Sequence, residues 1–89
     1  MKINNHFILR QLGDNIYVVE TINSDKQFNK IVTFNSSAAY LWDLYYNEEF
    51  TIEEVAKSIV DKYGIDRNKA GLDAKELIEK WKAAGLIDQ

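Results

Sequence analysis

Few residues of this 89-residue chain could take part in chemistry, because it contains no cysteine and a single histidine, His6. The lack of cysteine excludes a thiol nucleophile, a disulfide framework and thiolate metal sites. His6 precedes the first apolar segment, and no carboxylate stands at a spacing that would orient it, so we interpret it as a solvated side chain. The sequence therefore predicts neither a metal site nor a cofactor site.

Two pairs of neighbouring carboxylates are the other candidates for acid–base catalysis. Glu48-Glu49 lies in an expected turn, and Glu53-Glu54 lies in the first turn of an expected helix, where negative charge suits the helix dipole. Ser36-Ser37 has no partner histidine and is better explained as a helix start. The four glycines are isolated and form no phosphate-binding loop. We therefore expect a protein that is not an enzyme.

The composition is that of a globular chain, with 46% hydrophobic and 28% charged residues and a net charge of −3. It is long enough for one domain, which we place at residues 1–89. No segment is apolar enough to span a membrane, and the N-terminus lacks the apolar core of a signal peptide, which predicts a cytoplasmic protein. Residues 35–63 carry two basic against six acidic side chains. The absence of a basic stripe argues against nucleic-acid binding.

The first third of the chain predicts three β-strands. Residues 7–12 and 16–20 are rich in β-branched and aromatic side chains, and the Gly-Asp-Asn turn between them is typical of a hairpin. Residues 21–30 are polar apart from Phe28 and predict a longer connection. Residues 30–34 predict a third, short strand.

From Asn35 onward the apolar residues recur with the period of a helix. Asn35 or Ser36 can cap a first helix, and Thr51 begins a capping box with Glu54 that starts a second. Gly64 and Gly85 follow the second and third helices, and residues 86–87 are expected to fold back. The predicted fold is α+β and winged-helix-like, with three antiparallel strands followed by three helices. The apolar stripes of the first two helices are Ala38, Leu41, Trp42 and Tyr45, then Ile52, Val55, Ala56, Ile59, Val60 and Tyr63. The expected core face of the third helix is Ala70, Ala74, Leu77, Ile78 and Trp81.

An open three-stranded sheet leaves an edge strand whose backbone groups can accept an extended peptide as an additional strand. From the residues alone, the favoured interpretation is that this edge is covered, either by residues 21–30 or by a second copy of the chain. On the third helix Leu72 projects opposite Leu77 and Trp81. Leu72 is then either a single exposed apolar side chain or one side of a partner-binding groove.

Three stretches of the chain together resemble the coenzyme PQQ synthesis protein D (PqqD) family, a stand-alone recognition element for ribosomally made, modified peptides. The first stretch is residues 28–35 (FNKIVTFN), and the second is residues 38–44 (AAYLWDL), followed by the helix start at 51–55. The third combines residues 73–78 (DAKELI) with the Gly-Leu-Ile of residues 85–87. The chain departs from the family pattern at Lys30 and Ala38, where the family often has glycine, and it has no glycine in residues 47–50.

The resemblance implies a non-catalytic peptide chaperone that binds the leader segment of a precursor peptide by strand addition. It implies that the leader is presented to a modifying enzyme, often of the radical S-adenosylmethionine (radical SAM) type, in pathways that include PQQ biosynthesis. The implied peptide-binding residues are Ile31, Val32, Thr33 and Phe34 on the strand and Asp73, Glu76, Leu77 and Lys80 on the third helix. A proline at Val32 is expected to remove a backbone donor from that strand.

Two other functions remain open at this point. A winged-helix module that binds DNA would share the helix count, but Asp73, Glu76 and Glu79 would repel phosphates from its third helix. A dimerisation module would pair two third strands edge to edge and give a homodimer.

Overall fold

A computed structural model of the chain describes residues 1–21 and 31–88. The order of elements along the chain confirms three antiparallel strands followed by three helices, and it adds one short strand at each end. The elements are β1 (Lys2–Ile3), β2 (Phe7–Leu12), β3 (Asn15–Glu20), β4 (Ile31–Phe34), α1 (Ser36–Tyr45), α2 (Ile52–Tyr63), α3 (Arg67–Ala83) and β5 (Ile87–Asp88). The expected connection at 21–30, with Phe28, lies outside the described residues from position 22 onward.

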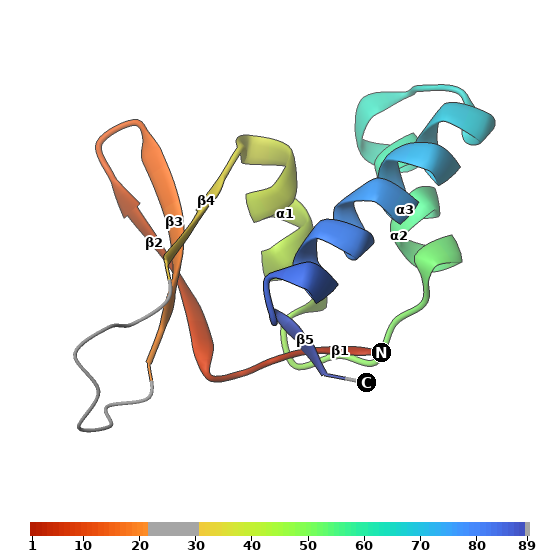
Figure 1. The fold of residues 1–89 in the computed structure, drawn as a ribbon. Helices are drawn as coiled ribbons and strands as arrows, with labels where there is room; N and C mark the ends of the chain where they lie inside the picture. The colour runs from red at the N-terminus through yellow and green to blue at the C-terminus, as the bar shows by residue number, and fades with distance from the viewer. Residues whose placement is uncertain (22–30, 89) are drawn as a thin grey trace.

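Strands β2, β3 and β4 form an antiparallel sheet in that order. The β2–β3 hairpin turns through Gly13 and Asp14, and Gly13 has a φ of +62°, a left-handed conformation that glycine adopts without steric cost. Val18, at the centre of the sheet, is fully buried. Figure 1 shows that the helices all lie to one side of this sheet, so that its other face is left uncovered by them.

The helices begin at the residues that the sequence predicts. The Asn35 side chain accepts a hydrogen bond from the Ala38 amide and caps α1. The Thr51 hydroxyl accepts from the Glu54 amide at 3.1 Å, while the Glu54 carboxylate accepts from the Thr51 amide at 2.9 Å. These reciprocal bonds form a capping box and satisfy two amides that have no partner inside the helix.

Replacing Thr51 with alanine should therefore lower the free energy of unfolding by about 1 kcal/mol. Thr51 is exposed, so little packing is lost with it. Urea denaturation followed by circular dichroism measures the difference, and Thr51→Ser, which keeps the hydroxyl, is the control. Equal losses in the two variants would mean that the cap contributes nothing measurable.

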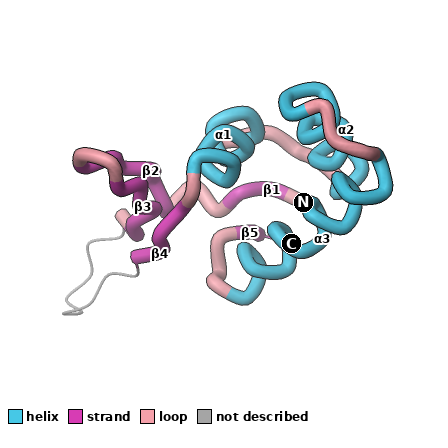
Figure 2. The backbone as a smooth tube through the Cα atoms, turned by 90° about the horizontal axis from the view of Figure 1, so that it is seen from above, coloured by secondary structure: helices cyan, strands magenta, loops and turns pink. Residues whose placement is uncertain are grey.

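The two ends of the chain pair with each other, which no pattern in the sequence indicates. Ile3 of β1 lies opposite Ile87 of β5, and both are buried. Figure 2 shows these two short strands side by side, and in the view of Figure 1 they lie below α1 and α3. The expected fold-back of residues 86–87 is confirmed, because the Leu86 amide donates to the Trp81 carbonyl at 2.9 Å and Leu86 is fully buried. Two-residue strands are too short to show a period in the sequence, which explains why the pairing was missed.

Three aromatic rings join the sheet to the helices. Phe34, the last residue of β4, stacks on Trp81 of α3 with ring centroids 5.6 Å apart, and it meets Trp42 of α1 edge-on at 5.5 Å. Trp42 and Trp81 also contact each other at 5.5 Å, and all three side chains are buried. This aromatic layer fixes the end of β4 against α1 and α3. Within the described parts of the chain, no helix has the length and apolar character needed to cross a membrane.

Candidate functional site

Strand β4 is an edge of the three-stranded sheet, since it pairs with β3 and with no other strand among the described residues. Its side chains alternate between the two faces. Val32 packs against the core and Phe34 is buried in it, whereas Ile31 is 63% exposed and Thr33 is exposed. The strand therefore offers one backbone edge to a further strand.

The alternation of the antiparallel ladder decides which residues of β4 direct their backbone groups to this edge. The Thr21 amide donates to the His6 carbonyl at 2.6 Å, and bonded pairs alternate along a ladder with pairs whose N–H and C=O point outward. Val18 is an odd number of residues from Thr21, so its backbone groups point the opposite way, away from β2 and toward β4. There Val18 lies opposite Val32. It follows that Val32 bonds to β3, and that Thr33 directs its N–H and C=O to the open edge. Proline at Val32 would thus break the sheet, so the predicted test belongs at Thr33.

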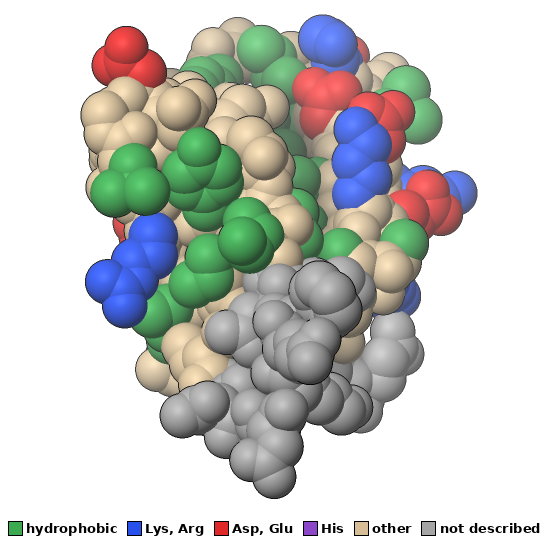
Figure 3. All heavy atoms as spheres, turned by 60° about the vertical axis from the view of Figure 1, so that its left-hand side comes forward, with side chains coloured by type: hydrophobic (Ala, Val, Ile, Leu, Met, Phe, Trp, Pro, Cys, Tyr) green, Lys and Arg blue, Asp and Glu red, His purple; other side chains and the backbone are tan. Residues whose placement is uncertain are grey.

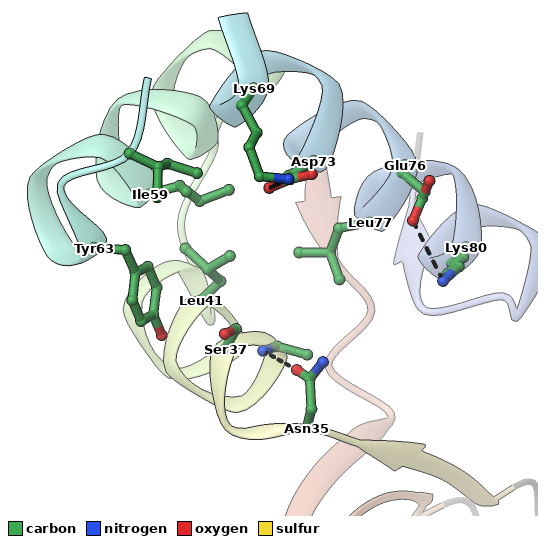
Figure 4. Close-up of a pocket in the computed structure, with 12 residues that line it drawn as sticks. Asn35, Ser37, Leu41, Ile59, Tyr63, Lys69, Asp73, Glu76, Leu77 and Lys80 are labelled. Carbon is green, nitrogen blue, oxygen red and sulfur yellow. Dashed lines mark hydrogen bonds and ion pairs between the residues drawn. The ribbon is translucent and has the colours of Figure 1, made fainter. Parts of the chain in front are cut away.

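A groove of about 410 Å³ begins where β4 ends and runs between α1, α2 and α3. Its interior is apolar: Leu41 of α1, Ile59 of α2 and Leu77 of α3 point toward one another across it (Figure 4). Asn35 lies at its β4 end, because the residue that caps α1 directly follows the strand. The open edge and the apolar groove are therefore neighbours.

Charged side chains of α3 form the rim of the groove. Lys69 pairs with Asp73 at 3.8 Å, and Lys80 pairs with Glu76 at 3.6 Å, each pair spanning one helical turn (Figure 4). The side chains of Lys69, Glu76 and Lys80 are about two-thirds or more exposed. The rim is therefore neutral in sum, and its charges can reorient toward a bound molecule.

The four helix residues expected at a binding site all line this groove: Asp73, Glu76, Leu77 and Lys80. Leu41, Ile59 and Lys69 also line it, and they were not among the expected site residues. Leu41 and Ile59 follow the apolar periods of their helices, which predicts core positions, and both are indeed buried and form the floor of the groove. Lys69 precedes Asp73 by four residues, and this spacing was a signal that could have found it.

Leu72 is 70% exposed and does not line the groove. It is therefore an exposed apolar side chain on the side of α3 that faces away from this groove. Across the described residues, the structure brings together no group of three His, Cys, Asp or Glu side chains that could hold a metal ion.

Comparisons with known proteins agree with this architecture. The family model of coenzyme PQQ synthesis protein D (PqqD) matches residues 8–87. No match was found among curated proteins. A solved structure described as "TbiB1 in Complex with the TbiA(beta) Leader Peptide" shares the fold with a TM-score of 0.75 at 18% sequence identity. The superposition covers 99% of this chain and 95% of that one.

Proposed function

The chain belongs to the coenzyme PQQ synthesis protein D (PqqD) family, and on this basis we propose that it is a non-catalytic peptide chaperone. It binds the leader segment of a ribosomally synthesised precursor peptide as an added strand at β4. The observation that carries the proposal is the open backbone edge of β4 beside an apolar groove. The leader-bound state of the TbiB1 structure, which has the same fold, supports the same kind of ligand.

Strand addition would divide the side chains of the peptide between two environments. Hydrogen bonds to the N–H and C=O groups of β4 supply affinity without regard to sequence, and side-chain pockets supply specificity. Alternate residues of the peptide point toward the helices, where the partly buried Leu77 offers an apolar contact beside the groove floor. The residues between them lie beside Ile31 and Thr33 on the opposite face of the sheet. The proposed peptide-binding residues are Ile31, Val32, Thr33, Phe34, Asp73, Glu76, Leu77 and Lys80.

The α3 rim adds charge contacts of modest strength. Exposed ion pairs contribute roughly 0–1 kcal/mol each, so Asp73 and Lys80 can exchange their present partners for groups of the peptide at little cost. A disordered leader loses conformational entropy on binding, which offsets part of the contact free energy. We expect the leader to bind with an affinity of roughly 1 µM, or about −8 kcal/mol. This strength suits a peptide that must be released to an enzyme.

The chaperone then presents the bound peptide to a modifying enzyme, for which a radical SAM enzyme is our proposal. We place the whole function in one recognition domain, residues 1–89, acting in the cytoplasm. DNA binding is not favoured, because the groove wall carries Asp73 and Glu76 beside its two lysines and provides no cationic surface.

Titrating the ¹⁵N-labelled protein with the leader peptide encoded beside its gene should shift amide signals at residues 31–34 and 70–82. These segments are the open edge and the groove wall, so their amides change environment when a strand is added. Lys57 and Asp61 on the exposed side of α2 serve as internal controls, because they form an ion pair away from the groove. Shifts confined to other segments of the folded protein would contradict strand addition at β4.

A further inference from the structure

The face of the β2-β3-β4 sheet that points away from the helices carries a second apolar surface. Its described apolar members are Ile8, Leu12, Tyr17, Val19 and Ile31, and we refer to them with Arg10 as the outer face. Leu9, Ile16 and Val32, which alternate with them, pack against the core instead. The outer face is therefore separate from both the core and the groove.

Three aliphatic side chains form a continuous row across the outer face. Ile8 lies opposite Val19, and Val19 lies opposite Ile31, so each strand contributes one member. Ile31 is 63% exposed, and Leu12, near the hairpin turn, is 68% exposed. Figure 3 shows hydrophobic side chains gathered over this part of the sheet. Single exposed apolar residues are ordinary, but a contiguous group on one sheet face is typical of an interaction surface.

Arg10 supplies the charge of this surface. It lies opposite Tyr17 in the middle of the hairpin, and it is exposed. The ion pairs formed among the described residues do not include it. Every other described member of the outer face is uncharged, so a carboxylate on a docking surface would complement it.

The size of the outer face distinguishes between possible occupants. β2 and β3 are six residues long and β4 is four, so with strands about 4.8 Å apart the sheet face covers roughly 250 Å². A stable protein–protein interface needs about 800 Å² on each partner. Two copies meeting face to face would also bring two Arg10 side chains into one small interface. Both arguments disfavour a second copy and favour a transient contact with a different protein.

We propose that the outer face docks a partner protein whose surface offers apolar side chains around a carboxylate that pairs with Arg10. Ile31 belongs to β4, so the docking surface is continuous with the edge at which we propose that the peptide binds. A docked protein would thus reach the outward side chains of a bound peptide. The docking itself goes beyond peptide capture and does not depend on it.

Site-specific photocross-linking in the cells that naturally express the chain tests this proposal. The photoreactive residue p-benzoylphenylalanine replaces Leu12 in one variant and Leu72 in the matched control, which is equally exposed at 70% but lies on α3. We expect the Leu12 probe to give one discrete product with a different protein, at about ten times the yield of the Leu72 probe. Adding Arg10→Glu should lower that yield about tenfold, and a carboxylate-to-lysine change in the captured protein should restore it.

Equal yields from the two probes, a product containing only a second copy, or a product indifferent to Arg10→Glu would each overturn the proposal. The Arg10→Glu protein is also titrated with the leader peptide, whose binding we expect to be unchanged. Failure of docking is thereby distinguished from failure of peptide capture.

Discussion

Replacing Thr33 with proline should weaken leader-peptide binding by about ten- to a hundredfold while the protein remains folded. The N–H of Thr33 faces the open edge of β4, so proline removes a donor that an added strand needs and leaves a peptide carbonyl without a partner. An unsatisfied group of this kind costs about 1–3 kcal/mol. Proline is tolerated on edge strands where the N–H faces solvent, and Thr33 is exposed.

Gln11→Pro is the matched control for this experiment. Gln11 lies opposite Ile16 in one of the outward-pointing pairs of the β2–β3 ladder, so its N–H faces the free edge of β2. The control therefore introduces the same residue into the same sheet at the edge that is remote from the groove. Isothermal titration calorimetry with the leader peptide measures both variants, after circular dichroism has verified their folding. Undiminished binding by a folded Thr33→Pro protein, or equal losses in the two variants, would rule out strand addition at β4.

Most of the fold could be predicted from the sequence because local signals and long-range packing agree. Thr51 with Glu54, and Gly64, are helix-end signals that act within one turn, and the structure has them at the two ends of α2. The strand pattern at 7–12 likewise coincides with β2. The β1–β5 pairing could not be predicted, because it joins two residues from each end of the chain and depends on tertiary contacts.

Part of the candidate site could also be predicted, but from the resemblance to a known family and not from local helix and strand signals. The resemblance to a known family selected Asp73, Glu76, Leu77 and Lys80, and the structure places all four along one groove. Apolar periodicity correctly assigned Leu41 to the core, but it could not show that a groove opens above this side chain, because the floor of a groove and the core occupy the same face of a helix. The direction of backbone groups in β4 was also inaccessible, since it depends on the register with β3.

Replacing Trp81 with alanine is expected to lower the free energy of unfolding by about 3–5 kcal/mol. Trp81 is 3% exposed and contacts both Phe34 and Trp42, so its removal leaves a cavity where α3 meets the end of β4. Domains of this kind have total stabilities of about 5–15 kcal/mol, so the loss is a large share of the whole. Urea denaturation monitored by far-ultraviolet circular dichroism measures it.

Two further variants show whether this loss comes from the aromatic layer. Trp81→Phe keeps a ring against Phe34 and should lose less stability, and Leu72→Ala, on the exposed side of α3, should stay within about 0.5 kcal/mol of the parent. Because the same contact holds the edge of β4 beside Leu77, we expect peptide affinity to fall in Trp81→Ala even where most molecules are folded. A Trp81→Ala protein as stable as Leu72→Ala would show that the aromatic layer does not hold the sheet to the helices. Some other contact would then have to hold the open edge of β4 beside the groove.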